Sequence, residues 1–439
     1  AAPSSISALM SGVLIKTGIY GIVRFCAFGL GPPEQSWGVL VVVLGGASAV
    51  LGVLYALMQH DLKRLLAYHS IENIGIILLG LGAGMIGLAY GRTDVASIGI
   101  AASLYHVLNH AVFKGLLFLG AGGVIMATGT RQIEQLGGLL RRMPWTGLFF
   151  LVGAMAISGL PPLNGFASEW LTFQALLYGF HGSAEPLVHS LFSIGGALLA
   201  LTTALAAACF VKAFGISFLA LPRSRAAADA HELPAMMLAP QAFLAALCVG
   251  LGLFPGVVVR MLGSVMASLP GLQPRADVVR GAMGMASGLS GSDSFDHVVP
   301  VLLGAAMLGG LAVAGLLTAR RGVTARRVPT WGCGGELTAR TEYTATAFSK
   351  PLMMIFQAVY RPTREVEALA EVSPYFPQEV RYRSEIEPTF ERYVYGPMLR
   401  GVIRVADGMK VLQAGSLHAY LAYVMALVVI LVLLVWWRG

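Results

Sequence analysis

Long apolar runs separated by short polar stretches dominate this 439-residue sequence. Several runs reach about twenty residues, the length that an α-helix needs to cross the hydrocarbon core of a bilayer. The pattern predicts an all-α polytopic membrane protein, since a membrane β-barrel would give short alternating segments instead. Nine crossings are expected, over Ser5–Gly29, Trp37–Met58, Leu65–Tyr90, Ile98–Ile125, Trp145–Tyr178, Ser190–Leu219, Met237–Leu262, Val299–Thr318 and Leu417–Trp437.

The fifth run, Trp145–Tyr178, is too long for one straight crossing, because a continuous helix over it would extend roughly 50 Å. The sequence SGLPPLNGF at 158–166 interrupts it with two prolines and two glycines. Prolines remove helix hydrogen bonds, and broken helices at membrane depth occur where they line a cavity or are enclosed by protein. The run therefore predicts a broken helix of the kind found at transport sites.

Lysine and arginine gather in alternate loops, which predicts the orientation of the chain. They occupy 60–64, 131–142, 223–225 and 320–327, whereas the loops between them have almost none. Under the positive-inside rule the basic loops are cytoplasmic, so the N-end lies inside and the C-end outside. Segment 263–298 is then external despite Arg275 and Arg280, and it is long enough to be less constrained by the rule.

Segment 319–416 is charged and rich in proline, unlike the rest of the chain, and is interpreted as a cytoplasmic insert before a last anchoring span at 417–439. Within it, Ser349–Tyr360 and Pro397–Leu412 are expected to form amphipathic helices that lie along the membrane or on a partner. The alternative is a solvated loop. The length and aromatic content of the insert favour docking on a partner.

The helix around Leu104–Leu119 carries a polar stripe. His106, His110 and Lys114 are spaced i, i+4 and i+8, so they share one helical face. Such groups are costly at membrane depth and usually mark a proton or ion path. Buried polar residues that hold helices together are the alternative. Three ionisable groups in one stripe favour the path.

Other apolar runs also contain ionisable residues, and the expected proton path adds Lys16, Glu72 and Glu169. Glu169 follows the break directly, and it is expected to be a terminal proton acceptor or the counter-ion of Lys114, two roles that are compatible. Two further candidates, His69 and Lys212, each have a structural alternative.

His69 either belongs to the path or is interfacial, and Lys212 either belongs to the path or extends its ammonium to the cytoplasmic edge. Asp61, Lys63 and Arg64 are expected at that same edge.

Composition agrees with a membrane protein and excludes several site types. The chain is 56% hydrophobic and 12% charged, with net charge +8 that is attributed to cytoplasmic loops and not to nucleic-acid binding. No CxxC pair, nucleotide-binding loop or nucleophile–base pair occurs, so no cofactor, metal or hydrolytic site is expected in this chain. The four cysteines are Cys26, Cys209, Cys248 and Cys333. The sequence begins without Met or a signal-peptide pattern, which predicts a piece of a longer protein.

Four stretches resemble the proton-conducting, antiporter-like membrane subunits of complex I, multi-subunit Na⁺/H⁺ antiporters and group 4 hydrogenases. They are SALMSGVLIKTGIYG, HDLKRLLAYHSIENIGII, LYHVLNHAVFKGLLFLGAGGVI and GGLLRRMPWTGLFFLVGAMAISGLPPLNGFASEW, within residues 1–262. The sequence HSIENIG and the tail with WGCGG and EYTATAFSKPL resemble the hydrogenase-4 component B and formate hydrogenlyase subunit 3 branch in particular.

The resemblance implies two inverted five-helix repeats. Residues 1–36 would hold the last helix of a truncated first repeat, 37–222 the second repeat and 223–318 additional crossings. Lys16 matches the family's connecting lysine, and His106, His110 and Lys114 match its central helix. Glu169 matches the terminal charged residue on the broken helix, and Glu72 resembles the second repeat's essential glutamate.

The implied function is that of a non-catalytic proton-translocating subunit in a respiratory or group 4 hydrogenase-type complex of a bacterial or archaeal cytoplasmic membrane. Its partners would be other membrane subunits and peripheral cytoplasmic redox subunits that hold Fe–S clusters and a NiFe centre. Two alternatives stay open: a subunit of a Na⁺/H⁺ antiporter, and a structural anchor with relict charges. The choice between H⁺ and Na⁺ is also open.

Overall fold

A computed structural model describes residues 2–29, 31, 33–182, 185–275, 278–280, 283–287, 296–320, 331–332, 334–339, 341–369, 379–386, 391–410 and 415–438. The chain divides into two compact units, Ala1–Met354 and Ile355–Gly439. This division falls inside the predicted insert 319–416, and the repeat boundaries stay predictions. Arg321, Arg326, Arg327 and Cys333 lie outside the described residues.

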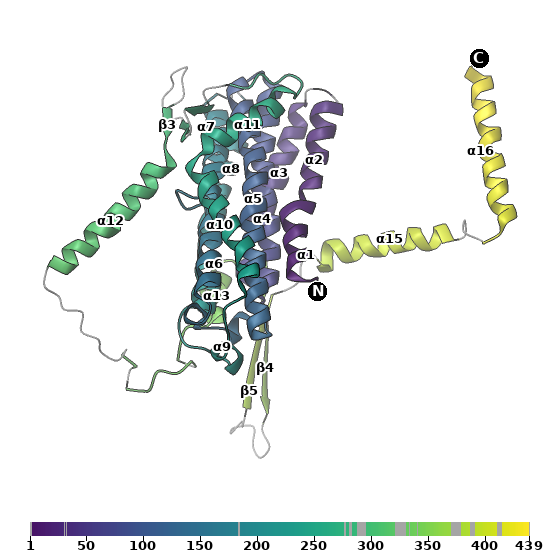
Figure 1. Cartoon of the computed structure of the whole chain (residues 1–439). Coiled ribbons are helices and arrows are strands. Elements are labelled where there is room, and N and C mark those ends of the chain that lie inside the picture. The colour runs from purple at the N-terminus through teal and green to yellow at the C-terminus, as the bar shows by residue number, and fades with distance from the viewer. Residues whose placement is uncertain are drawn as a thin grey trace. The chain divides into compact units, whose positions relative to one another are not determined.

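The first unit is a helical bundle (Figure 1). Its helices are α1 (Ser4–Leu9), α2 (Lys16–Val23), α3 (Gln35–Leu57), α4 (Leu62–Ala89), α5 (Thr93–Thr128), α6 (Pro144–Ile157), α7 (Asn164–Gly182), α8 (Pro186–Phe218), α9 (Arg225–Ala228), α10 (Ala235–Leu253), α11 (Pro255–Ala267), α12 (Pro300–Arg320) and α13 (Ala345–Ile355). Short π-helical turns η1 (Met10–Leu14) and η2 (Arg24–Gly29) and 3-10 turns η3 (Ile133–Gln135) and η4 (Leu139–Arg141) join them.

Eight helical segments of the described chain are long and apolar enough to cross a membrane: Ser4–Cys26, Gln35–Leu57, Leu62–Ala89, Thr93–Thr128, Pro186–Phe218, Ala235–Leu253, Pro300–Ala319 and Leu417–Trp437. The prediction of a polytopic all-α membrane protein is confirmed. The fifth predicted crossing, Trp145–Tyr178, is the broken pair α6 and α7, which separates at the predicted proline–glycine stretch. One prediction is wrong: Met237–Leu262 is not a single span. A new helix starts at Pro255, because proline cannot donate the hydrogen bond that would continue α10.

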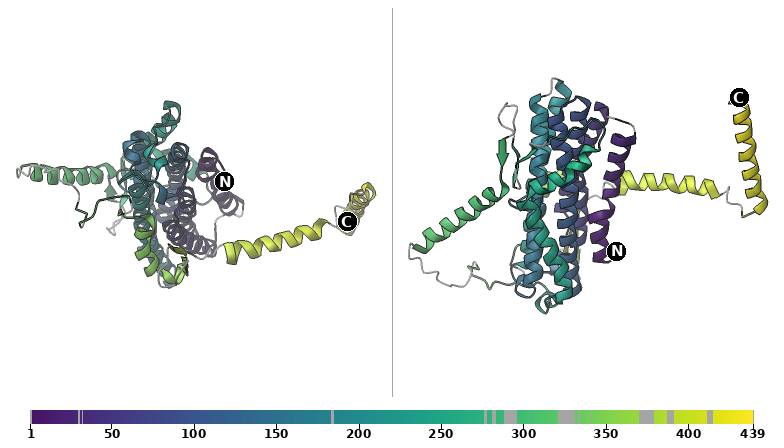
Figure 2. Two further views of the ribbon diagram at one scale, coloured as in Figure 1. Left: turned by 90° about the horizontal axis from the view of Figure 1, so that it is seen from below. Right: turned by 45° about the horizontal axis from the view of Figure 1, so that its top comes forward.

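Glycines bring α3 and α4 into backbone contact. A Cβ atom at Gly75 would lie 2.4 Å from the backbone nitrogen of Ala49, and one at Gly52 would lie 2.5 Å from that of Glu72. Such a stripe of small residues lets two helices approach closely where no hydrophobic effect drives their association. Glu72 is therefore enclosed against α3. Helices α3, α4 and α5 form successive neighbours in the bundle, as the two views of Figure 2 show.

Helix α5 approaches the other side of α4 in the same way, because a Cβ atom at Gly99 would lie 2.6 Å from the backbone nitrogen of Gly84. Helix α4 consequently has both flanks covered, and most of its residues are buried. The buried polar residues described below lie on α4 and on the helices packed against it.

Small β-structures were not predicted from the sequence. In the first unit, β1 (Val279–Arg280), β2 (Gly284–Ser287) and β3 (Asp296–Val298) form an antiparallel sheet in the order β1-β2-β3. In the second unit, β4 (Thr363–Leu369) pairs antiparallel with β5 (Glu379–Glu385), in a register that sets Thr363 opposite Glu385.

The second unit also contains α14 (Gln357–Tyr360), the π-helical turn η6 (Glu391–Tyr395), α15 (Gly396–Met409) and α16 (Leu417–Arg438). The helix predicted at Pro397–Leu412 corresponds to α15, and the last predicted crossing corresponds to α16. The helix predicted at Ser349–Tyr360 is divided at Phe356, between α13 and α14.

We predict that Gly82→Ala lowers the thermal stability of the full-length protein in detergent. A Cβ atom there would lie 2.8 Å from the backbone nitrogen of Val42, so α3 and α4 must separate. Overpacking of this kind costs about 1–3 kcal/mol, more than the gain of up to about 1 kcal/mol in helix propensity. Gly196→Ala on α8 is the control, since its Cβ meets nothing within 4 Å. Equal melting temperatures for the two variants would contradict this account of the packing.

Candidate functional site

The eight ionisable residues singled out in the apolar runs are all buried. Lys16 is 9% exposed and the others are at most 3% exposed: His69, Glu72, His106, His110, Lys114, Glu169 and Lys212. Burial does not give membrane depth, so the interfacial alternative for His69 stays a prediction. Lys212 is fully enclosed by protein, with its ammonium at the carbonyls of Leu57 and Gln59.

His69 and Glu72 form the centre of the site on α4. Their side chains are hydrogen bonded to one another, from His69 Nδ1 to Glu72 Oε2. Asn73 Nδ2 donates to the same carboxylate oxygen at 3.2 Å and to the His69 carbonyl at 2.8 Å. The His69 ring also packs on Phe210 of α8, with ring centroids 4.7 Å apart. A buried carboxylate needs such partners, because leaving it unpaired costs several kcal/mol or more.

His106 on α5 joins α4 to the broken helix. Its Nε2 lies 3.1 Å from Asn73 Oδ1, and its Nδ1 lies 2.9 Å from the Ser168 hydroxyl of α7. The amide oxygen of Asn73 can only accept, so His106 Nε2 carries a hydrogen. The serine hydroxyl can donate or accept, so the network orients the ring with one nitrogen toward each helix.

Asn109 and Asn164 extend this network to the point where the broken helix resumes. Asn109 Nδ2 donates to the Asn164 carbonyl at 2.7 Å and to the Ser168 hydroxyl at 2.9 Å. Asn164 is the first residue of α7, and its Oδ1 accepts from the Gly165 backbone N–H at 3.1 Å. Polar backbone freed by the break is thereby satisfied inside protein, as a non-helical segment at membrane depth requires.

The bridging residues were missed in the sequence. Asn73, Asn109, Asn164 and Ser168 are neutral, and none was a candidate. Helical spacing was the available signal: Asn73 lies four residues after His69, and Ser168 lies four residues after Asn164. What spacing could not indicate is that these polar faces meet across three helices.

The three buried lysines donate to backbone carbonyls. Lys16 Nζ lies 2.5 Å from the Ser11 carbonyl, and Lys114 Nζ lies 2.5 Å from the Leu66 carbonyl. Lys212 Nζ lies 2.5 Å from the Leu57 carbonyl. Among the described residues, none of the three forms an ion pair within 4.0 Å.

Electrostatic interactions link these lysines to the rest of the row. Lys114 interacts electrostatically with Glu72 and with Lys16. Glu169 accepts a hydrogen bond from Thr203 Oγ1 of α8 at 2.9 Å. Both roles expected for Glu169, terminal proton acceptor and counter-ion of Lys114, stay predictions.

Glu169 borders a cavity of about 380 Å³, lined also by Phe166, Trp170 and Thr203. Gly159 leaves room for this carboxylate, because a Cβ atom there would lie 2.7 Å from Glu169 Oε2. Its φ of 62° also favours glycine. The break therefore shapes the surroundings of Glu169 directly.

A larger cavity of about 610 Å³ lies beside α1 and α4. The Asp61–Arg131 ion pair, 2.6 Å long, lies at its wall together with Lys63. The Ser11 and Ser70 hydroxyls, hydrogen bonded to one another at 2.6 Å, line it as well. Since Lys16 donates to the Ser11 carbonyl, this cavity adjoins the backbone that holds Lys16.

His110 occupies the interval between His106 and Lys114 on α5. Its ring is parallel to that of His106 within 9°, with centroids 6.4 Å apart. Both of its ring nitrogens are buried and have no hydrogen-bond partner among the described residues. They remain able to accept or donate a proton. Across the same described residues, no group of three or more His, Cys, Asp or Glu side chains could hold a metal ion.

Comparison with known proteins agrees with this geometry. A family model described as NADH:quinone oxidoreductase/Mrp antiporter, transmembrane, matches residues 1–183, the part that holds Lys16 to Glu169. The uncharacterized protein Rv0083 of Mycobacterium tuberculosis is 41% identical over 99% of this chain and 68% of its own length. Hydrogenase-4 component B of Escherichia coli is 36% identical over 99% of this chain and 64% of its own. The chain thus spans about two thirds of the length of these relatives.

Among solved structures, a chain of the membrane-bound sulfane sulfur reductase, an archaeal respiratory membrane complex, is similar with a TM-score of 0.68. It is 27% identical, and the match covers 98% of this chain and 63% of that chain. These similarities confirm the resemblance to the antiporter-like subunits and to the hydrogenase-4 component B type. The chain belongs to the NADH:quinone oxidoreductase/Mrp antiporter family of multi-pass membrane subunits.

Proposed function

We propose that this chain conducts protons as a membrane subunit of a redox complex related to complex I and the group 4 hydrogenases. The observation that carries the proposal is the buried network that runs from His69 and Glu72 through Asn73 and His106 to Ser168 on the broken helix. Ionisable groups inside a membrane are costly and characterise ion and proton pathways.

Glu72 and Lys114 supply the electrostatic coupling. They interact across the α4–α5 contact, so the protonation state of one changes the energy of protonating the other. A proton that reaches Lys114 favours the ionised Glu72, and its departure favours the neutral carboxyl. The protonation states of the two groups are therefore coupled. A conformational change elsewhere in a complex can alter them, and they can in turn alter its energy.

His106 is the proposed relay toward the broken helix. An imidazole accepts a proton on one nitrogen and releases one from the other, and His106 presents its two nitrogens to different helices. Asn73 cannot carry a proton, so its role is to orient Glu72 and His106. Glu169, beside its own cavity, would be the terminal group, with Lys16 at the opposite end of the row.

The relatives support the proposed partners and location. One is named as a component of a hydrogenase, and one similar structure is a chain of an archaeal respiratory membrane complex. We infer that Fe–S clusters and a NiFe centre, where present, belong to peripheral cytoplasmic subunits, and that this chain is a non-catalytic subunit in a bacterial or archaeal cytoplasmic membrane. Cation/proton antiport is the second candidate, supported by the Mrp antiporter part of the family description.

We predict that Lys114→Ala abolishes proton pumping by the full complex, because it removes the cation that faces Glu72. Proton uptake into proteoliposomes during substrate oxidation is the measurement. Lys410→Ala is the control, since the Lys410 side chain is 75% exposed and pairs with Asp407. Unchanged pumping in the Lys114 variant would sink the proposal and support a structural anchor.

Asn73→Ala is expected to slow pumping about tenfold while the protein still folds, because one buried hydrogen bond to a relay group is worth about 1–2 kcal/mol. Thr172→Ala on α7 is the matched control: its hydroxyl donates only to the Ser168 carbonyl, outside the side-chain network. A pumping rate that falls equally in both variants would mean that general packing, and not the orientation of Glu72 and His106, limits the rate.

Replacing Na⁺ by choline is expected to leave pumping unchanged, because lysine and histidine side chains carry protons, whereas hard cations take oxygen ligands. Proton and ²²Na⁺ movements in the same proteoliposomes measure the difference. Pumping that stops without Na⁺ would favour the antiporter candidate instead.

A further inference from the structure

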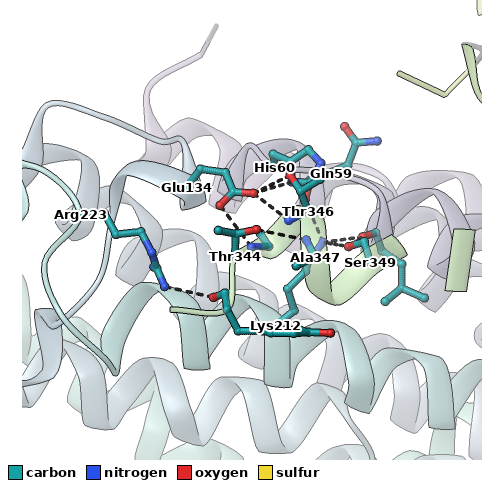
Figure 3. Close-up of polar contacts among 12 residues, drawn as sticks. Gln59, His60, Glu134, Lys212, Arg223, Thr344, Thr346, Ala347 and Ser349 are labelled. Atoms are coloured by element: carbon teal, nitrogen blue, oxygen red, sulfur yellow. Dashed lines mark hydrogen bonds and ion pairs between the residues drawn. The ribbon is translucent and has the colours of Figure 1, made fainter. Parts of the chain in front are cut away.

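The segment Glu342–Ser349, called the strap here, lies against the end of the bundle that the positive-inside pattern predicts to be cytoplasmic (Figure 3). It contains the start of α13 and belongs to the part of the predicted insert that lies within the first unit. Three separate anchors hold it, and each comes from a different element of the bundle.

Glu134 of η3 is the first anchor. Its Oε1 accepts from the Thr346 backbone N–H at 2.7 Å and from the Thr346 hydroxyl at 2.6 Å, and its Oε2 accepts from the Ala345 N–H at 3.2 Å. A carboxylate at this position satisfies the free N–H groups at the beginning of α13 and complements the helix dipole.

Arg223 and Glu342 make the second anchor. Glu342 accepts from the Leu221 backbone N–H with both carboxylate oxygens, at 3.1 and 3.0 Å, and lies 3.7 Å from Arg223 Nη2. The same Nη2 donates to the Tyr343 carbonyl at 3.2 Å. The Arg223 side chain is only 7% exposed, so this guanidinium is held in place and little screened by solvent.

Lys212 and Ser349 make the third anchor, at the end of α3. Lys212 Nζ donates to the Leu57 and Gln59 carbonyls at 2.5 and 2.9 Å and lies 3.4 Å from Ser349 Oγ, which itself donates to the Leu57 carbonyl at 2.8 Å. These carbonyls have no partner within α3, since the helix ends at Leu57. Ser349 is 2% exposed and Lys212 is fully buried, so the strap covers the ammonium.

Below Lys212, α8 leads to the central pair. Cys209 lies three residues before Lys212 on α8 and is fully buried. Phe210 packs on the His69 ring, and His69 is hydrogen bonded to Glu72. The covered ammonium is therefore the outermost member of a column that ends at Glu72.

His60 flanks this column at the surface. Its side chain is 35% exposed, and its Nδ1 lies 3.9 Å from Glu134 Oε1. Burial and the nearby charge of Lys212 lower the pKa of His60, while Glu134 opposes the shift. Glu134 thus contacts the strap and also lies near His60, a titratable group that interacts with Lys212.

We propose that the docked strap closes the cytoplasmic entrance to Lys212 and the His69–Glu72 pair, and that its release opens this entrance to protons. The inference rests on the proposed function. Glu134, Arg223 and Ser349 are positioning residues in it. The chain continues from α13 directly into the second unit, Ile355–Gly439, so a pull on that unit by a partner is transmitted along the backbone to the strap.

Two readouts on the full complex in proteoliposomes test the proposal. The first is labelling of Ala345→Cys by a membrane-impermeant maleimide, quantified on the peptide, since Ala345 is fully buried under the docked strap. The second is passive proton leak under an imposed potential without electron donor. Glu134→Gln is expected to raise the labelling rate at least tenfold and the leak several-fold, and adding Lys114→Ala is expected to remove the extra leak.

Glu232→Gln is the matched control. Glu232 caps α6 in the same manner, accepting from the Trp145 N–H at 2.7 Å and from the Thr146 hydroxyl at 2.6 Å, and it does not contact the strap. It should change neither readout. An equal rise in leak in this variant would assign the effect to general loosening and overturn the proposal.

Three further results would overturn the proposal that the strap closes an entrance. Labelling that rises without leak would mean that the strap covers no entrance. Labelling that rises in neither Glu134→Gln nor the Glu134→Gln/Glu342→Gln double variant would mean that these carboxylates do not hold the strap. If Lys114→Ala abolishes pumping but does not remove the extra leak of Glu134→Gln, the leaking protons follow another route. Normal pumping by Lys114→Ala alone would instead remove the proposed function, so the two failures are distinguishable.

Discussion

The cost of an unpaired polar group at membrane depth is the constraint on which the rest of this structure depends. Glu72 illustrates it: the carboxylate is 1% exposed, His69 and Asn73 hydrogen bond to it from its own helix, and Lys114 on the next helix interacts with it electrostatically. Each of those partners needs partners in turn. The requirement propagates through His106 and Asn109 until it reaches the start of α7.

Close helix packing makes this propagation possible. The glycines of α3, α4 and α5 bring three backbones together, so short side chains such as Asn73 and Ser168 can reach across helix boundaries. The broken helix serves the same end, because its opening at Gly159 admits the Glu169 carboxylate and its restart at Asn164 offers a carbonyl to Asn109. Close packing and the polar network therefore depend on one another, because small residues create the space that the polar side chains fill.

At the end of the bundle that the positive-inside pattern predicts to be cytoplasmic, charged side chains satisfy the unpaired polar groups. Lysine and glutamate complete the helix ends there: Lys212 satisfies the carbonyls at the end of α3, and Glu134 and Glu232 satisfy the N–H groups that begin α13 and α6. Two of these three caps also fasten the strap. A capping interaction that is ordinary in a soluble protein here joins a segment near the second unit to the column above Glu72.

Much of the fold and of the candidate site could be predicted from the sequence. The features with local signals were predictable, and the contacts between distant segments were not. Apolar run length predicted the spans, the prolines at 161 and 162 predicted the break between α6 and α7, and isolated charges in apolar runs identified all eight buried groups. These are local signals. The sequence did not indicate that Lys114 interacts with Glu72, because that depends on which helices are neighbours.

Nor did local pattern predict that Ser349 would cover Lys212, a contact between residues far apart in the chain. The separation of α10 from α11 was missed for a simpler reason. A single proline in an otherwise apolar run gave a weaker signal than the double proline of the fifth run, although the break at Pro255 has the same cause.

The most direct test of the central claim is the number of protons pumped per electron by the full complex carrying Glu72→Gln. This change removes the carboxylate that couples to Lys114 while keeping the size and hydrogen-bonding capacity of the side chain. The account predicts that electron transfer continues and that the proton-to-electron ratio falls. An unchanged ratio at an unchanged turnover rate would contradict it, because protons would then cross without the buried pair on which the proposed path depends.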